Sequence, residues 1–241
     1  MKRQLLLLAA MLCLGGTAMA QNEEAITGNG KNVKEQREIT QFTGIYVKGP
    51  FEVTISDNNE SHVTLEGSQN IVSLIDVEVT DGTLKISLPE GHKFKAHKNN
   101  KVAIRIPYQS GLKNISLCGS GSIVCRSTIK TNVKVNLEGS GHIALNLYSA
   151  QGEACVLGSG DIILKGAVQD FSCKVIGSGT ILAENLESAN VEASVSGSGN
   201  AYVICNKAMK GKISGSGNIA FSGSPAEQEL KRTGSGEYKT F

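Results

Sequence analysis

A Gly-Ser-Gly triplet recurs through the second half of this chain at an almost constant spacing. The seven triplets begin at residues 119, 139, 158, 177, 197, 215 and 234, so the steps between them are 20, 19, 19, 20, 18 and 19 residues. Repetition at a fixed period of this length is the sequence signature of a solenoid, in which each repeat is one unit of a stack. We therefore predict coils of about 19 residues, each marked by one triplet.

Apolar residues stand at fixed, even offsets from each triplet. Four residues after its first glycine lie Ile123, Ile143, Ile162, Ile181, Ala201 and Ile219, and two residues before it lie Leu117, Leu137, Val156, Val175, Val195 and Ile213. A period of two is that of a β-strand, so these columns and both glycines should face the interior while the serine faces out. Each strand then lies beside its equivalent in the next coil, which makes the sheets parallel. The predicted fold is all-β, a right-handed parallel β-helix or β-roll solenoid over residues 118–241.

The first half of the chain carries a different strand pattern. Residues 37–117 lack the triplet but contain short alternating segments rich in β-branched residues, which is typical of strands. Asp81-Gly82 between two such segments predicts a hairpin turn. We expect this part to continue the solenoid or to cap it, because uncovered coils invite edge pairing. The polar residues 21–36 are predicted to be a flexible leader.

The end of the chain contains one segment that departs from the strand pattern. Residues 224–241 should cover the last coil. Within them, Ser224-Pro225-Ala226-Glu227 combines a capping box with proline at the first helical position. We predict a short helix or turn there.

Residues 1–20 have the composition of a secretory signal peptide. A basic start at Lys2-Arg3 is followed by a short apolar run from Leu5 to Leu14 and by Ala18-Met19-Ala20, a cleavage pattern. The run is too short to span a bilayer, and no longer one follows, so the mature chain should have no transmembrane segment. Cleavage after Ala20 would remove Lys2 and Arg3, which leaves 22 basic and 22 acidic residues and no net charge in the mature chain. We expect an exported protein of the periplasm or outer cell surface that does not bind nucleic acid.

Five cysteines remain after residue 20, namely Cys118, Cys125, Cys155, Cys173 and Cys205. Their offsets from the triplets place most pairs on opposite faces or on distant coils; Cys125 and Cys205 would be roughly 19 Å apart at strand spacing, beyond the reach of a disulfide. We therefore predict buried free thiols. The sequence contains no CxxC, HExxH or GxSxG pattern, so we predict no metal, no cofactor and no catalytic residues.

One outward-facing column is unexpectedly apolar. Five residues after each triplet's first glycine lie Val124, Ala144, Ile163, Leu182, Tyr202 and Ala220. An exposed apolar stripe usually marks a contact, although parallel sheets are often covered on both faces by their own chain. Val124, Ile163, Leu182 and Tyr202 are therefore a candidate contact stripe, with intrachain cover, a homo-oligomer, a partner or a lipid-like ligand all left open.

Two polar features are weaker candidates. The segment from His92 to Lys101 is locally basic, so Lys93, Lys95, Lys98 and Lys101 could meet an anionic glycan or lipid headgroup, or could simply form a solvated loop. The column three residues after each triplet's first glycine contains His142 and Asp161 among Ser, Thr and Asn. It has too few carboxylates for polysaccharide cleavage and is interpreted as a solvated polar ladder.

The order of these motifs is similar to that of a known family. The stretch REITQFTGIYVKGPFEVTISDNNESHVTLEG, the stretch VAIRIPYQSGLKNISLCGSGSIV and the repeated G-S-G-x-I units resemble the putative auto-transporter adhesin, head GIN domain family, over about residues 37–236. The resemblance implies a secreted protein with a parallel β-helix-like fold and an adhesin role, and it supplies no catalytic residues.

These observations favour an exported, non-enzymatic β-helix protein that acts by adhesin-like binding or as a structural part of the cell envelope. The partner expected is a surface polymer, a glycan or a protein, with self-association through the stripe as a further possibility. The alternatives are a carrier of lipids or amphiphiles and, less favoured, an enzyme acting on polysaccharide. The absence of Trp counts against a strong sugar-stacking platform.

Overall fold

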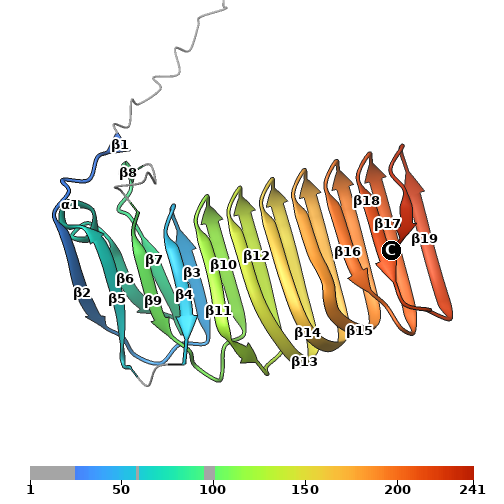
Figure 1. Cartoon of the computed structure of the whole chain (residues 1–241), viewed down its shortest axis with the longest axis horizontal. Helices are drawn as coiled ribbons and strands as arrows, with labels where there is room; N and C mark the ends of the chain where they lie inside the picture. Colours follow the sequence, from blue (N-terminus) through green and yellow to red (C-terminus); the bar gives the residue numbers. More distant parts are fainter. Residues whose placement is uncertain (1–24, 58–59, 95–100) are drawn as a thin grey trace, which may run out of the picture.

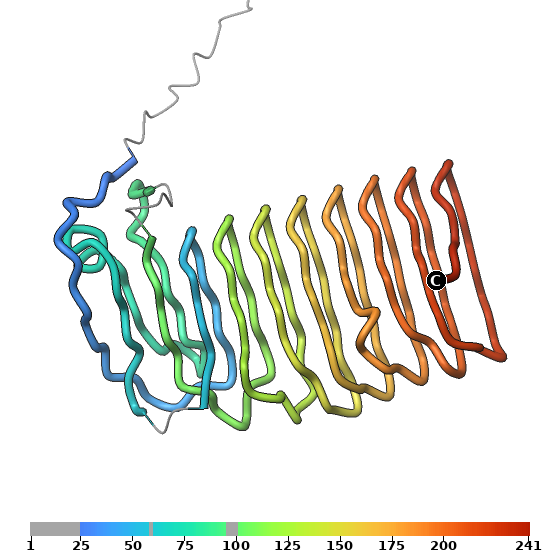
Figure 2. Tube along the Cα trace, viewed as in Figure 1, coloured from blue at the N-terminus to red at the C-terminus, as the bar shows by residue number. Residues whose placement is uncertain are grey.

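The computed structural model describes residues 25–57, 60–94 and 101–241. Within these ranges there are twenty strands and one short helix, arranged as an elongated stack of coils (Figure 1). The tube in Figure 2 shows the coils following one another along the long axis, with the N-terminal elements at one end and the C-terminal residues at the other. The fold is the predicted parallel β-solenoid. The predicted signal peptide, residues 1–20, lies outside the described residues.

Three long strands show how a coil is built. They are β13 (His142–Gly158), β14 (Asp161–Gly177) and β15 (Thr180–Gly197). Each runs along one sheet, turns at the corner opposite the triplet and returns along a second sheet. We call the sheet before each triplet the incoming sheet and the sheet after it the outgoing sheet. The strands pair in parallel with equivalent residues side by side, as predicted.

The remaining repeat strands fill the two sheets. The incoming sheet contains β10 (Asn114–Gly119), β12 (Val133–Gly139), β17 (Ala208–Gly215) and β19 (Glu227–Thr233). The outgoing sheet contains β11 (Ser122–Ile129), β16 (Asn200–Ile204), β18 (Asn218–Ser222) and β20 (Tyr238–Thr240). All their pairings with one another and with the long strands are parallel.

The solenoid continues into the first half of the chain, in an interleaved order. Two coils there consist of β3 (Gly44–Lys48) with β4 (Glu52–Ser56), and of β7 (Thr83–Ser87) with β9 (Ala103–Pro107). Strand β3 lies between β7 and β10, and β4 lies between β9 and β11. Counted from the N-terminal end of the stack, the chain therefore forms the second coil first (β3 and β4), then the outermost coil (β7 and β9), and then the third (β10 and β11).

The outermost coil is closed by strands that leave the parallel pattern. They are β2 (Asn32–Glu38), β5 (His62–Ser68) and β6 (Asp76–Thr80), and the short helix α1 (Gln69–Val72) connects β5 to β6. Strand β5 pairs antiparallel with β9, β2 with β5, and β6 with β7. A small separate sheet pairs β1 (Ala25–Ile26) with β8 (Lys93–Phe94). The first half of the chain thus both continues the solenoid and caps it.

The predicted hairpin at Asp81-Gly82 is confirmed. It joins β6 to β7, and both residues have positive φ, 50° and 68°. That backbone suits a tight two-residue turn, whose twist matches the flanking strands.

Two local predictions are wrong. Residues 32–36, placed in a flexible leader, form most of β2 and pair with β5, because the edge of β5 offers them a hydrogen-bonding partner. For Ser224–Glu227 the helix is wrong and the alternative of a non-helical turn is closer: residues 223–226 form a bent connection between β18 and β19, Pro225 is buried, and Glu227 begins β19 in register with Ala208. Pairing with the previous coil outweighs the local capping signal.

The interior columns are as predicted. The isoleucines after the triplets and the apolar residues before them are buried from coil to coil and form one continuous core. The triplet's serine is exposed in every repeat and its second glycine is buried. The first glycine takes a positive φ, such as 113° at Gly139, and a Cβ on Gly141 would lie 2.7 Å from the carbonyl oxygen of Gly121. Only glycine fits this corner without strain.

Candidate contact surface

The outward apolar column forms a continuous line across the outgoing sheet. We call Val124, Ala144, Ile163, Leu182 and Tyr202 the outer ladder. The strand register places each of them directly beside the next, from β11 through β13, β14 and β15 to β16. In-register neighbours in a parallel sheet are one strand spacing apart, about 4.8 Å. The fold therefore assembles one surface from residues scattered over nearly 80 positions of sequence, 124 to 202.

The outer ladder meets a polar residue directly at its N-terminal end and, after one buried alanine, at its C-terminal end. Val124 pairs on its N-terminal side with Thr54, and the column continues beyond Tyr202 to the buried Ala220 and then Lys239. Val124 is 37% exposed, and the other four side chains are half-buried by their neighbours in the sheet. The result is a narrow apolar strip of defined length.

Cover by the same chain is limited to one end in the part of the chain that the structure describes. The ring of Phe241 lies 6.3 Å from that of Tyr202, in an edge-on arrangement. The one described helix, α1, contacts β5 and β2 at the N-terminal cap instead. A helix or strand over the outer ladder, one of the alternatives left open by the sequence, is not found among the described elements.

Polar columns flank the outer ladder. On one side the column containing His142 and Asp161 continues through Thr180 to Asn200 and Asn218. Asn218 donates from Nδ2 to Oδ1 of Asn200 over 3.0 Å. This is the solvated polar ladder predicted from the sequence. On this side, therefore, the apolar strip is bordered by groups that prefer water.

The basic segment is not assembled into a patch by the described residues. Lys101 pairs with Glu52, with Nζ and Oε1 2.5 Å apart. Lys93 lies in β8, at the edge of the small separate sheet. Lys95 and Lys98 lie outside the described residues.

A hollow of about 880 Å³ lies beside that segment, at the first corner of the solenoid. Its wall combines apolar side chains, among them Pro50, Leu88 and Phe94, with Lys48 and Cys118. The triplet period does not predict it, because residues 88–94, which form part of its wall, lie outside the repeat. Leu88 and Pro89 are followed by the polar Glu90 and His92, so this segment has no apolar pattern that indicates a hollow.

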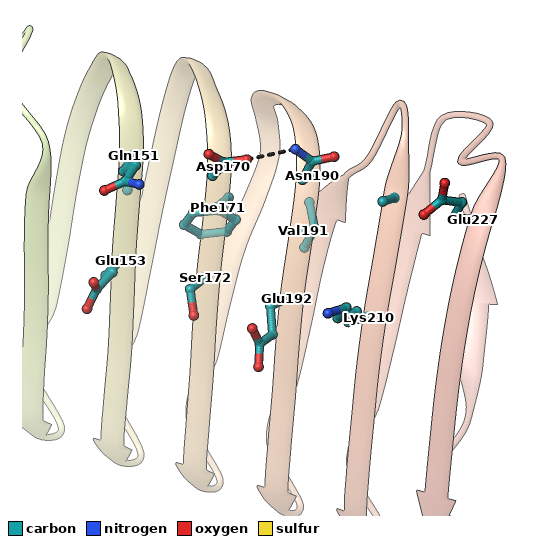
Figure 3. Close-up of a pocket in the computed structure, with 12 residues that line it drawn as sticks. Gln151, Glu153, Asp170, Phe171, Ser172, Asn190, Val191, Glu192, Lys210 and Glu227 are labelled. Atoms are coloured by element: carbon teal, nitrogen blue, oxygen red, sulfur yellow. Dashed lines mark hydrogen bonds between the residues drawn. The ribbon is translucent and has the colours of Figure 1, made fainter.

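The structure also groups carboxylates that the sequence analysis missed. Glu153, Asp170, Glu192 and Glu227 line an open groove of about 500 Å³ on the incoming sheet, together with Lys210 (Figure 3). They come from two columns before the triplets, whereas the polar ladder predicted from the sequence lies after them.

The partners of these carboxylates indicate a structural role. Asp170 accepts a hydrogen bond from Asn190 over 2.7 Å, and Glu153 lies 3.4 Å from Lys134. Lys210 stands next to Glu192 in the same column. The groove is a polar ladder with interspersed charge.

The five cysteines in the described part of the chain are free thiols, as predicted, but only Cys125, Cys173 and Cys205 are buried. The prediction of burial is wrong for Cys118 and Cys155, which stand at odd offsets from the triplets and so face outward. Burial raises the pKa of Cys125 to about 11 and that of Cys173 to about 12. A thiol held neutral in this way is not a nucleophile at physiological pH. Among residues 25–57, 60–94 and 101–241, no three His, Cys, Asp or Glu side chains are placed to bind a metal ion.

Comparison with known proteins identifies the class to which this architecture belongs. The family described as "Putative auto-transporter adhesin, head GIN domain" matches residues 41–225. The chain belongs to this family, as the resemblance of its motifs implied. No curated protein matches the chain.

Solved structures share the fold. A crystal structure of a putative adhesin from Bacteroides fragilis NCTC 9343 has a TM-score of 0.80 at 26% identity, covering 90% of this chain and 100% of that one. A putative lipid binding protein from Parabacteroides distasonis ATCC 8503 has a TM-score of 0.74 at 22% identity, with the same coverage. A putative adhesin from the same organism has a TM-score of 0.67 at 23% identity, covering 89% and 100%.

The family supports an adhesin-like role at an extracellular site or on a surface. No helix among the described residues is both long enough and apolar enough to cross a bilayer.

Proposed function

We propose that this chain is an exported, non-enzymatic adhesin-like protein that binds its partner through the outer ladder. Residues 1–20 would direct export, and the partner would be a polymer, glycan or protein of a cell surface. The observation that carries the proposal is the in-register line of partly exposed apolar side chains from Val124 to Tyr202.

The physical basis is the removal of apolar surface from water. Burying apolar area gains about 25 cal/mol per Å², and contiguous apolar patches on soluble proteins commonly mark interaction sites. A stack of hydrogen-bonded strands also fixes the spacing of the side chains in advance, so little conformational entropy is lost on binding. The framing columns, such as that of Asn200 and Asn218, add polar contacts at the rim.

The test is a binding screen with paired surface variants. The chain without residues 1–20 would be assayed on glycan, envelope-polymer and extracellular-matrix arrays. Ile163→Lys with Leu182→Lys should weaken the strongest interaction at least about tenfold, equal to about 1.4 kcal/mol. The matched control, Ser172→Lys with Ser196→Lys, adds the same charge to the outer face of the incoming sheet and should bind like the wild type.

Folding must be monitored in the same experiment. Circular dichroism and the melting temperature should be alike in both double variants, because all four positions face outward. Equal binding by the folded ladder variant and the wild type would reject the outer ladder as the contact surface.

The site of action is tested separately. Protease or antibody access on intact cells, with lysed cells as control, should show the chain outside the cell. Protection until lysis would contradict the adhesin role and would favour a structural function inside the envelope.

A second candidate function is binding of a lipid or other amphiphile in the corner hollow. It is favoured by the hollow's apolar wall, which includes Leu88 and Phe94, with Lys48 nearby for an anionic headgroup. A fluorescent fatty acid should then bind saturably, and Leu88→Lys should weaken it. No saturable binding to the wild type would reject this candidate.

A further inference from the structure

The last coil of the solenoid presents an open strand edge. Strand β19 pairs with β17 on one side, and its other side is unpaired among the described residues. All seven of its residues, Glu227 to Thr233, are exposed. An edge of this kind is a template for pairing with another strand.

The free backbone groups of β19 belong to alternate residues. Glu227 donates its amide to the carbonyl oxygen of Lys207, one residue before its register partner Ala208. Successive residues of a strand direct their amide and carbonyl groups to opposite edges. The groups of Gln228, Leu230 and Arg232 therefore point away from β17 and toward the open end.

The sequence of β19 is self-complementary when read antiparallel about its centre. The strand is Glu-Gln-Glu-Leu-Lys-Arg-Thr. A second copy related by a two-fold axis at Leu230 would place Leu230 opposite Leu230, Glu229 opposite Lys231, and Gln228 opposite Arg232. The residues with free backbone groups would then form the hydrogen-bonded pairs. Glu229 and Lys231 would form the other kind of pair, in which opposing side chains are closer.

The side chains on the two faces of β19 also suit this arrangement. Leu230 is in register with the buried Gly211 and so points toward the core, yet it is 36% exposed, since none of the described residues forms a further coil beside it. Tyr238 reaches across the end of the core and donates its hydroxyl to the carbonyl oxygen of Lys231 over 2.7 Å. Glu229 and Lys231 stand on the outer face, 2.5 Å apart.

We propose that two copies of this chain associate end to end by antiparallel pairing of their β19 strands. The pairing would bury Leu230 of both copies in one extended core and would place each Glu229 carboxylate next to a Lys231 ammonium of the other copy. This interface is separate from the outer ladder, so it stands or falls independently of the proposed function.

The test uses charge reversal at the paired positions. Sedimentation equilibrium of the chain without residues 1–20 should show a monomer–dimer equilibrium. In a dimer of the Glu229→Lys variant, lysine at position 229 of each copy lies opposite Lys231 of the other. In a dimer of the Lys231→Glu variant, Glu229 of each copy lies opposite glutamate at position 231 of the other. Each variant alone should raise the dimer dissociation constant at least tenfold. A 1:1 mixture of the two variants should restore the dimer, since every lysine then meets a glutamate.

A restored dimer in the mixture would also show that both variants are folded, because each must present an intact β19 strand. As a matched control, Lys212→Glu makes the same charge change on β17, one coil away from the edge, and should leave the dimer unchanged. A wild type that stays monomeric up to about 1 mM would overturn the proposal. So would a dimer that persists in both single variants, or a mixture that fails to associate.

Discussion

The two ends of the solenoid solve the problem of the exposed edge in different ways. At the N-terminal end, β5 and β6 pair antiparallel and α1 packs against β5 and β2, so that Ile71 and Val72 are fully buried. At the C-terminal end the coils stop at β19, a strand with seven exposed residues. Figure 1 shows the hairpins at one end and the single last coil at the other.

The difference also concerns chain order. The outermost N-terminal coil, β7 with β9, is separated from the repeat by β3 and β4, which precede it in sequence. Opening that coil requires distant segments to separate together. The last C-terminal coil follows its neighbour directly in sequence and can detach alone. We expect the N-terminal end to unfold with the whole molecule and the C-terminal end to open locally.

The largest contrast is expected from truncating one core residue at each end. Ile104 in β9 is fully buried, so Ile104→Ala should lower the free energy of unfolding by about 2–5 kcal/mol. Leu230 in β19 is 36% exposed, so Leu230→Ala should cost about 1 kcal/mol or less. Urea denaturation at a concentration that keeps the chain monomeric measures both. Similar losses for the two variants would contradict the proposed difference between the ends.

A smaller contrast should follow from adding one methyl group at equivalent triplet glycines. Gly139 and Gly234 have nearly the same φ, 113° and 112°, so the backbone strain of alanine is matched. At Gly139 the new Cβ would lie 2.6 Å from the carbonyl oxygen of Gly119, with coils on both sides. We expect Gly139→Ala to cost about 1–3 kcal/mol.

Gly234→Ala meets the same kind of contact with Gly215, but the last coil can move away from it. Its effect on thermal unfolding should therefore be the smaller of the two. An equal or larger loss at Gly234 would show that the last coil is held as firmly as the interior ones.

The native cysteines report opening along the axis. Cys205 lies near the C-terminal end, Cys173 in the middle and Cys125 close to the N-terminal coils; all three are buried, and burial raises the pKa of each thiol. Labelling therefore requires local opening. Single-cysteine variants should react with a thiol reagent about tenfold faster at Cys205 than at Cys125. Partly exposed Cys118 and Cys155 serve as fast controls, and equal rates at the buried sites would count against local opening.

The smallest effect concerns the charge pair on β19. Lys231 hydrogen-bonds Glu229 and holds the pKa of that carboxyl below its ordinary value. A lowered folded pKa contributes stability above the unfolded pKa and loses it as the pH falls through the folded pKa. Both groups are fully exposed, so the pair should not shift the acid unfolding midpoint. An NMR titration should find the pKa of Glu229 below the ordinary range, and the Lys231→Gln variant should return this pKa to the ordinary range. An unchanged pKa in that variant would refute the pairing.

The repeat was predictable because parity and period together determine the geometry. The even offsets of Ile143 and Val156 specify the inside, and the odd offset of Ile163 specifies the outer ladder. The N-terminal order was not predictable, since nothing local in β3 indicates that it lies between β7 and β10. The helix signal at Ser224–Glu227 misled because a neighbouring strand edge outweighs a local cap. The acidic groove was not predictable from any one column, because its carboxylates belong to two of them. Glu153 and Glu192 stand five residues before a triplet, whereas Asp170 stands seven residues before one.

Hydrogen exchange of the whole chain at low concentration tests the central difference between the ends most directly. The amides of β9 and β4 should exchange only through global unfolding, while those of Leu230 and Arg232 in β19 should exchange many times faster. Raising the concentration should then slow exchange at Leu230 and leave β9 unchanged. Equally slow exchange at both ends in dilute solution would contradict the account of a sealed N-terminal end and an open C-terminal coil.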